Sequence, residues 1–175
     1  MFFIPGWLIA AVTFPGVMLH EWAHKFFCDR FQVRVLAVRY FQFGQDVAGF
    51  VQHDPPSTFR QHLFIGIAPL IVNSLAAIIV AAMAAQAKTD SALMYFFWWL
   101  SMSFGAHALP SRRDADSIGD SIGRARASGA SAWILAAWPL VQVLRVASAL
   151  KLFWIDIIFA AALVVVGAAL GTHLP

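Results

Sequence analysis

The chain has 175 residues, of which 61% are hydrophobic and only 12% are charged, and its mean hydropathy of +0.73 excludes an ordinary water-soluble domain. Its 12 Lys and Arg outnumber its nine Asp and Glu, but these cations lie between apolar segments, so we expect no nucleic-acid partner. One cysteine, Cys28, excludes an internal disulfide. The composition therefore predicts an all-α, polytopic membrane protein of a single domain that is embedded in a lipid bilayer.

The first apolar run extends from Phe2 to about Phe27 and is long enough to cross a membrane. We interpret it as a retained transmembrane helix rather than a signal peptide, since no basic residue precedes it. Pro15 lacks a backbone N–H and is expected to bend this helix one turn before His20.

Near its end the run contains His20-Glu21-Trp22-Ala23-His24, which fits the pattern H-E-x-x-H. Residues four apart lie on one face of a helix, so both imidazoles can bind one metal ion while Glu21 acts as a general base. Glu21 is the only glutamate of the chain, and ionisable groups within apolar segments tend to be functional. A pair of histidines that only pack between helices is the alternative.

A hairpin is expected after this helix. Residues 33–41 are rich in β-formers, Gly44 begins a turn, and residues 47–51 form a second short apolar piece. We expect the hairpin to lie over the mouth of the site, where its edge at Val33 to Val38 could pair with an extended substrate. A hairpin that only caps the helices is an equal alternative.

Four further apolar segments follow. A second span is predicted from His62 to Ala85 and contains Asn73, whose amide needs a partner inside the membrane. A third span is predicted over residues 92–109, followed by a polar loop. Segments at about 130–150 and 152–170 then form one or two additional transmembrane helices.

A third metal ligand is sought near the end of the third span. Basic residues cluster after the first and third spans, which puts the N-terminus outside and both loops in the cytoplasm, so the active site is expected to face the cytoplasmic side. Asp114 is the preferred ligand because it is nearer to the membrane end, with Asp116 as the alternative, although either could instead cap a helix. His107 is expected to be a ligand, a donor that orients one, or a substrate contact. Cys28 is unsuitable, because three ligands on consecutive turns of one helix span about 12 Å.

Three features together resemble the site-2 protease family of intramembrane zinc metalloproteases: the intramembrane H-E-x-x-H, the stretch Ala68 to Asn73 in the second span, and a third span that ends in a proline and aspartates. The resemblance implies a three-helix metalloprotease core within residues 1–116, outside which lie the helices of residues 130–172. It also implies a Zn²⁺ cofactor held by two histidines and an aspartate, and a transmembrane protein substrate.

By this resemblance Glu21 is the base, Asn73 holds the substrate or the oxyanion, and Asp114 or Asp116 is the third ligand. The chain departs from the family pattern at His107-Ala108-Leu109-Pro110, where the family has N-x-x-P, and no Asp-Gly follows. It would therefore be a divergent, minimal member without a regulatory domain.

The expected function is that of a membrane-embedded zinc endopeptidase in which Glu21 takes a proton from a zinc-bound water and Asn73 or His107 steadies the oxyanion. The alternatives are a metal-binding transporter or sensor, and a catalytically inactive relative that binds membrane proteins. The sequence leaves the substrate and the oligomeric state open.

Overall fold

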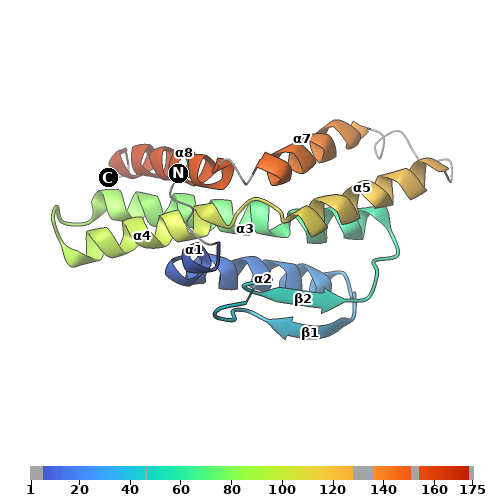
Figure 1. Ribbon diagram of the computed structural model, residues 1–175. Coiled ribbons are helices and arrows are strands. Elements are labelled where there is room, and N and C mark those ends of the chain that lie inside the picture. The colour runs from blue at the N-terminus through green and yellow to red at the C-terminus, as the bar shows by residue number, and fades with distance from the viewer. Residues whose placement is uncertain (1–5, 46, 128–135, 151–153, 174–175) are drawn as a thin grey trace.

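The computed structural model describes residues 6–45, 47–127, 136–150 and 154–173. Within these ranges the chain forms helices joined by short connections and one two-stranded sheet (Figure 1). In chain order the elements are α1 (Gly6–Val12), α2 (Phe14–Arg30), β1 (Val35–Arg39), β2 (Phe50–His53), α3 (Phe59–Gln86), α4 (Ala92–Ala106), α5 (Arg112–Ala127), α7 (Trp138–Ala149) and α8 (Ile155–Thr172). The expected mostly helical fold with a small hairpin after the first helix is confirmed.

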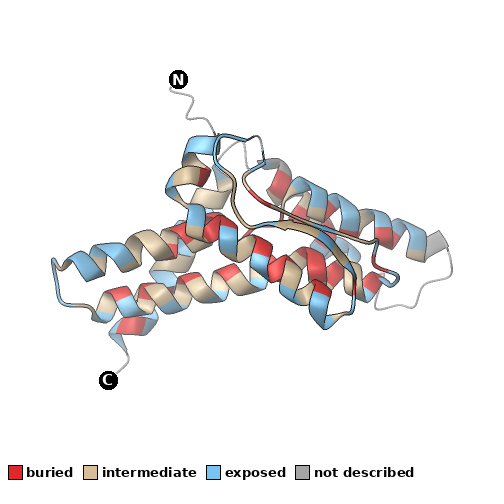
Figure 2. Cartoon of the chain, turned by 90° about the horizontal axis from the view of Figure 1, so that it is seen from below, coloured by how far each residue is buried: buried red, intermediate tan, exposed pale blue. Residues whose placement is uncertain are grey.

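The longest helix, α3, is the centre of the fold. Helices α2, α4, α5 and α8 all pack against it, and α7 packs on α5 (Figure 1). Buried residues gather where these helices meet, and exposed residues follow their outer faces (Figure 2). Thr58 and Gln61 begin α3 with a capping box, in which each side chain accepts a backbone N–H of the other residue.

The first apolar run is divided at Thr13 into α1 and α2. Pro15 lies in the first turn of α2, where the N–H that proline lacks would have no helical partner. The single helix with a bend at Pro15 that the sequence predicts is therefore wrong: among the described residues the run forms two helices, which meet at Thr13.

Two helices, α3 and α8, are long and apolar enough to cross a membrane, and α4 is a shorter apolar helix of 15 residues. Part of the predicted segment at 130–150 lies outside the described residues, and its described helix, α7, has 12 residues, fewer than the roughly 20 that a span requires. The described residues thus contain two candidate spans rather than the four or five predicted ones.

The polar stretch after Pro110 is helical, so the predicted loop is wrong. Ala115, Ile118 and Ile122 recur every three or four residues along α5 and are buried. Ile118 and Ile122 form a cluster with Leu63 of α3 and Val141 of α7. This apolar stripe holds an otherwise polar helix against the bundle.

The hairpin pairs β1 and β2 in antiparallel register, with Arg39 opposite Phe50 and Val35 opposite His53. A bulge between Val35 and Ala37 interrupts the ladder. Both strands contact α2, so the sheet lies beside the helix that carries the H-E-x-x-H motif.

Candidate metal centre

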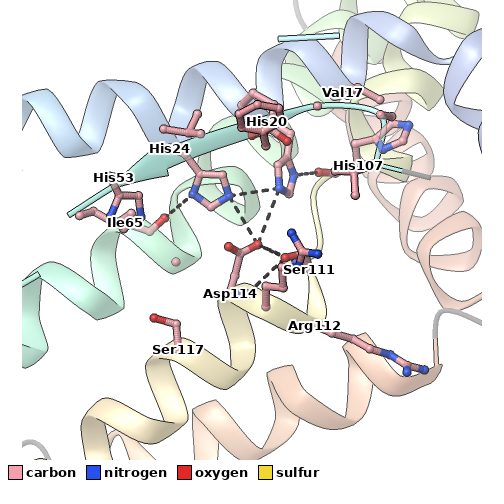
Figure 3. Close-up of a pocket in the computed structure, with 18 of the residues that line it drawn as sticks. Val17, His20, His24, His53, Ile65, His107, Ser111, Arg112, Asp114 and Ser117 are labelled. Atoms are coloured by element: carbon pink, nitrogen blue, oxygen red, sulfur yellow. Dashed lines mark hydrogen bonds and ion pairs between the residues drawn. The ribbon is translucent and has the colours of Figure 1, made fainter. Parts of the chain in front are cut away.

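Three side chains from two helices converge at one point: His20 and His24 of α2, and Asp114 of α5 (Figure 3). The Nε2 atoms of the two imidazoles are 3.2 Å apart. Asp114 Oδ2 lies 3.8 Å from His20 Nε2 and 3.5 Å from His24 Nε2. The predicted pair of histidines and the preferred aspartate are thus brought together, and this group can hold a metal ion.

The other ring nitrogen of each histidine faces a backbone carbonyl. His20 Nδ1 lies 2.7 Å from the oxygen of His107, and His24 Nδ1 lies 2.9 Å from that of Ile65. A carbonyl oxygen can only accept, so each Nδ1 carries a hydrogen, and the Nε2 of each ring is the atom turned toward the other ligands. The two Nε2 atoms and a carboxylate oxygen then face one another, an arrangement that is repulsive unless a proton or a metal ion lies between them.

The spacing of the three atoms fits a metal ion. A point equidistant from them lies about 2.0 Å from each, within the range of zinc bonds to nitrogen or oxygen, roughly 2.0–2.2 Å. Imidazole and carboxylate are also the donor set of many catalytic transition-metal sites. The group therefore matches such an ion in both distance and chemistry.

Asp114 lies in the first turn of α5 and helps to cap the start of that helix as well as facing the histidines. Its Oδ2 accepts hydrogen bonds from the backbone N–H of Ser111 at 2.8 Å and from the Ser111 hydroxyl at 2.6 Å, and the backbone N–H of Asp114 donates to that hydroxyl at 3.2 Å. Burial alone would raise the pKa of the Asp114 carboxyl, but the imidazoles of His24 and His20 outweigh it and hold this pKa well below its usual range. The carboxylate therefore stays ionised, as binding of a cation requires.

A cavity of about 550 Å³ opens onto the three ligands and is also lined by Glu21. Residues 47–51, which comprise the start of β2 and the three residues before it, form another wall, so the hairpin lies over the site as predicted. Gly49 packs directly on Glu21, because a Cβ there would come 2.8 Å from Glu21 Cγ and 2.9 Å from the oxygen of Tyr40. Only glycine lets the hairpin approach the carboxylate this closely.

The strand that borders the cavity is β2, with Phe50, Val51 and His53 in its lining. No residue of β1 lines the cavity, and Val33 to Val38 border a separate depression beside the end of α2. The edge expected at Val33 to Val38 is therefore on the wrong strand for a peptide that reaches the metal group, because β1 is separated from the cavity by β2.

Asn73 and His107 are both expected to contact the substrate, but only His107 lines the cavity. Asn73 is fully buried, does not line the cavity, and donates from Nδ2 to backbone carbonyls. His107 lines the cavity, its ring Nε2 is 2.7 Å from Thr13 Oγ1, and its carbonyl is the group that meets His20 (Figure 3).

The two remaining candidates lie outside the group. Asp116 is 69% exposed and forms an ion pair with Arg145 of α7 at 3.6 Å. Cys28 is fully buried in a cluster with Val33 and Ile65, consistent with a small apolar residue.

Several lining residues were not singled out from the sequence, among them Gly49, His53, His62, Ile65 and Ser111. Ser111 carried a usable signal, since serine followed three residues later by an acidic side chain is typical of a helix start. The Ile65 carbonyl carried none, because backbone groups do not depend on residue type.

Comparison of the chain with protein-family models, with curated proteins and with solved structures gives no match in any of the three.

Proposed function

We propose that this chain is a membrane-embedded zinc endopeptidase of the site-2 protease type, which hydrolyses peptide bonds in membrane-spanning substrates. The single observation that carries the proposal is the convergence of two Nε2 atoms and one carboxylate oxygen at metal-binding distance, with Glu21 in the same cavity. Three protein ligands with an open fourth position are typical of catalytic rather than structural zinc.

Glu21 is the proposed general base. A bound zinc would supply a water of lowered pKa and polarise the scissile carbonyl. Glu21 lies one residue after His20 and lines the cavity, and no donor among the described residues has a hydrogen bond to its carboxylate. It is therefore free to take the proton of an attacking water and pass it to the leaving amine.

The substrate is proposed to lie along β2. A peptide must be extended for its carbonyl carbons to be attacked, because a helix encloses them in its hydrogen-bonded backbone. The two-stranded sheet leaves one edge of β2 without a strand partner among the described residues, and β2 borders the cavity. A locally unwound segment could add there as a third strand and bring a carbonyl to the metal group.

The membrane setting is supported by the outer faces of the helices as well as by α3 and α8. Four large apolar residues of α2 recur at every fourth position on the face opposite the histidines, and all are exposed: Phe14, Met18, Trp22 and Phe26. A contiguous apolar surface of this kind is unfavourable in water and suits contact with lipid. A substrate with a transmembrane segment would share this environment.

The test uses the full chain purified in detergent and reconstituted in liposomes with a single-span reporter protein. We expect about one zinc per chain, and Glu21→Gln should retain the metal but lose cleavage, because Glu21 is a base and no ligand. Asp29→Asn is the matched control, since Asp29 is a carboxylate on the same helix that pairs with Lys25 at the surface. Absence of bound zinc, or cleavage by Glu21→Gln at the parent rate, would refute the proposal.

A further inference from the structure

Asn73 joins three helices at one point. Its side chain is fully buried in α3, and Nδ2 faces three carbonyl oxygens: that of Gly16 in α2 at 3.0 Å, and those of Phe104 and His107 at the end of α4 at 3.3 Å each. Its Oδ1 is buried without a hydrogen-bond partner among the described residues. The amide therefore acts here as a donor.

The surroundings offer the amide several acceptors. His107 is the C-cap of α4 and Phe104 lies in its last turn, where carbonyls lack the regular donors of a helix interior. The Phe104 carbonyl accepts the backbone N–H of His107 at 3.2 Å, and the His107 carbonyl accepts from His20 Nδ1. A carbonyl oxygen has two lone pairs, so each of these groups can also accept from Asn73 Nδ2.

The point of contact is also one of close backbone approach. The Gly16 N–H donates to Ser103 Oγ at 2.9 Å, and a side chain at Gly16 would overlap the Ser103 carbonyl. Helices α2 and α4 thus touch through their backbones beside the Asn73 amide. A small displacement of this amide would be transmitted directly to both helices.

One of the three carbonyls also orients a metal ligand. The His107 oxygen accepts from Asn73 Nδ2 and from His20 Nδ1, and a carbonyl has two lone pairs for two such donors. We infer that Asn73 is a positioning residue, an inference that rests on the proposed metal site. Asn73 fixes the His107 carbonyl, and this carbonyl holds the His20 ring with Nε2 toward the ion. Asn73 acts two hydrogen bonds away from the metal and touches no substrate.

The experiment compares Asn73→Ala with Ser101→Ala in the full chain. Ser101 is a matched control because it too is fully buried and joins α4 to α3, through a hydrogen bond from Oγ to the Ala77 carbonyl at 2.7 Å, but it has no contact with the metal group. Zn²⁺ affinity is measured by competition with a chelator. Co²⁺ is the spectroscopic probe, because its visible absorption depends on coordination geometry.

Both substitutions should lower the melting temperature, but only Asn73→Ala should weaken Zn²⁺ binding, by about ten- to a hundredfold, as loss of groups that orient ligands typically does. Only Asn73→Ala should also change the Co²⁺ spectrum. If Asn73→Ala does not accumulate, Asn73→Asp keeps the volume and, when protonated, one donor, and a smaller change in the same direction is expected.

Parent-like affinity and spectrum in both Asn73 variants would overturn the positioning role, as would an equal loss of affinity in Ser101→Ala. These outcomes leave the metal site itself standing. If the parent chain binds neither Zn²⁺ nor Co²⁺, the proposed function fails and this inference fails with it.

Discussion

Replacement of Asp114 by asparagine separates the two roles of this side chain. Asparagine keeps an oxygen that can accept from the Ser111 backbone and hydroxyl, so the start of α5 should survive with a loss of at most about 1 kcal/mol. It removes the negative charge that faces both imidazoles. We therefore expect a folded chain with impaired metal binding.

The magnitude follows from the number of ligands. Structural zinc sites with four protein ligands bind with an apparent free energy of about 10–16 kcal/mol, or about 3 kcal/mol per ligand. Loss of one of three ligands should thus weaken Zn²⁺ binding by about a hundredfold. The measurement is competition between the purified protein and a chromophoric chelator, with a thermal melt to confirm folding.

Asp116→Asn is the control for this prediction, because Asp116 lies two residues away on the same helix but faces Arg145 and solvent. It should leave Zn²⁺ affinity within about threefold, or roughly 0.6 kcal/mol. The role of Asp114 as a ligand is refuted if Asp116→Asn lowers Zn²⁺ affinity as much as Asp114→Asn does, or if Asp114→Asn binds Zn²⁺ with the affinity of the parent chain.

Two further predictions concern the elements around the site. Gly49→Ala should slow cleavage by about a hundredfold with unchanged zinc affinity, because the new methyl displaces Glu21 or the hairpin. Gly44→Ala is the control: Gly44 has φ +69° and open space around it, so this substitution should lower only the free energy of unfolding, by about 1 kcal/mol. Equal loss of cleavage in both variants would contradict this prediction. Arg145→Gln should lower the melting temperature by about 2–4 °C, since its ion pairs to two aspartates of α5 are partly exposed and are together worth about 1 kcal/mol. The decrease in melting temperature caused by Arg145→Gln should be smaller in about 1 M salt. A decrease that salt does not change would argue that Arg145 stabilises the chain by packing instead.

The ligands were more predictable from the sequence than the elements that carry them. A spacing of four on a helix is enough to put His20 and His24 on one face, and that holds wherever the helix begins. The choice of Asp114 rests on its distance along the chain from the membrane end, which is a weaker argument. In the structure, Ser111 at the start of α5 holds the carboxylate in place through two hydrogen bonds.

The composition of residues 112–127 predicts a polar loop, whereas their periodicity predicts the helix that the structure shows as α5. Its polar residues outnumber its apolar ones, but Ala115, Ile118 and Ile122 repeat at helical spacing. The choice of strand at the cavity could not be read from the sequence at all. Both strands of a hairpin alternate in the same way, and only packing on α2 decides which of them borders the site.

The structure also explains why the helix without ligands matters most to the site. Helix α3 orients His24 through the Ile65 carbonyl, and the next residue, Gly66, makes room for Ile118 of α5, the helix that carries Asp114 in its first turn. Two turns later Asn73 reaches His20 through the carbonyl of His107. The positions of all three ligands thus depend on contacts with α3. A displacement of α3 would therefore shift each ligand, whereas a displacement of α5 would shift only Asp114. Residue types alone identify the side chains that can hold the ion, but not the helix that aligns them. Two of the three contacts that α3 makes are invisible to residue type, because the Ile65 contact is a backbone carbonyl and the Gly66 contact depends on the absence of a side chain.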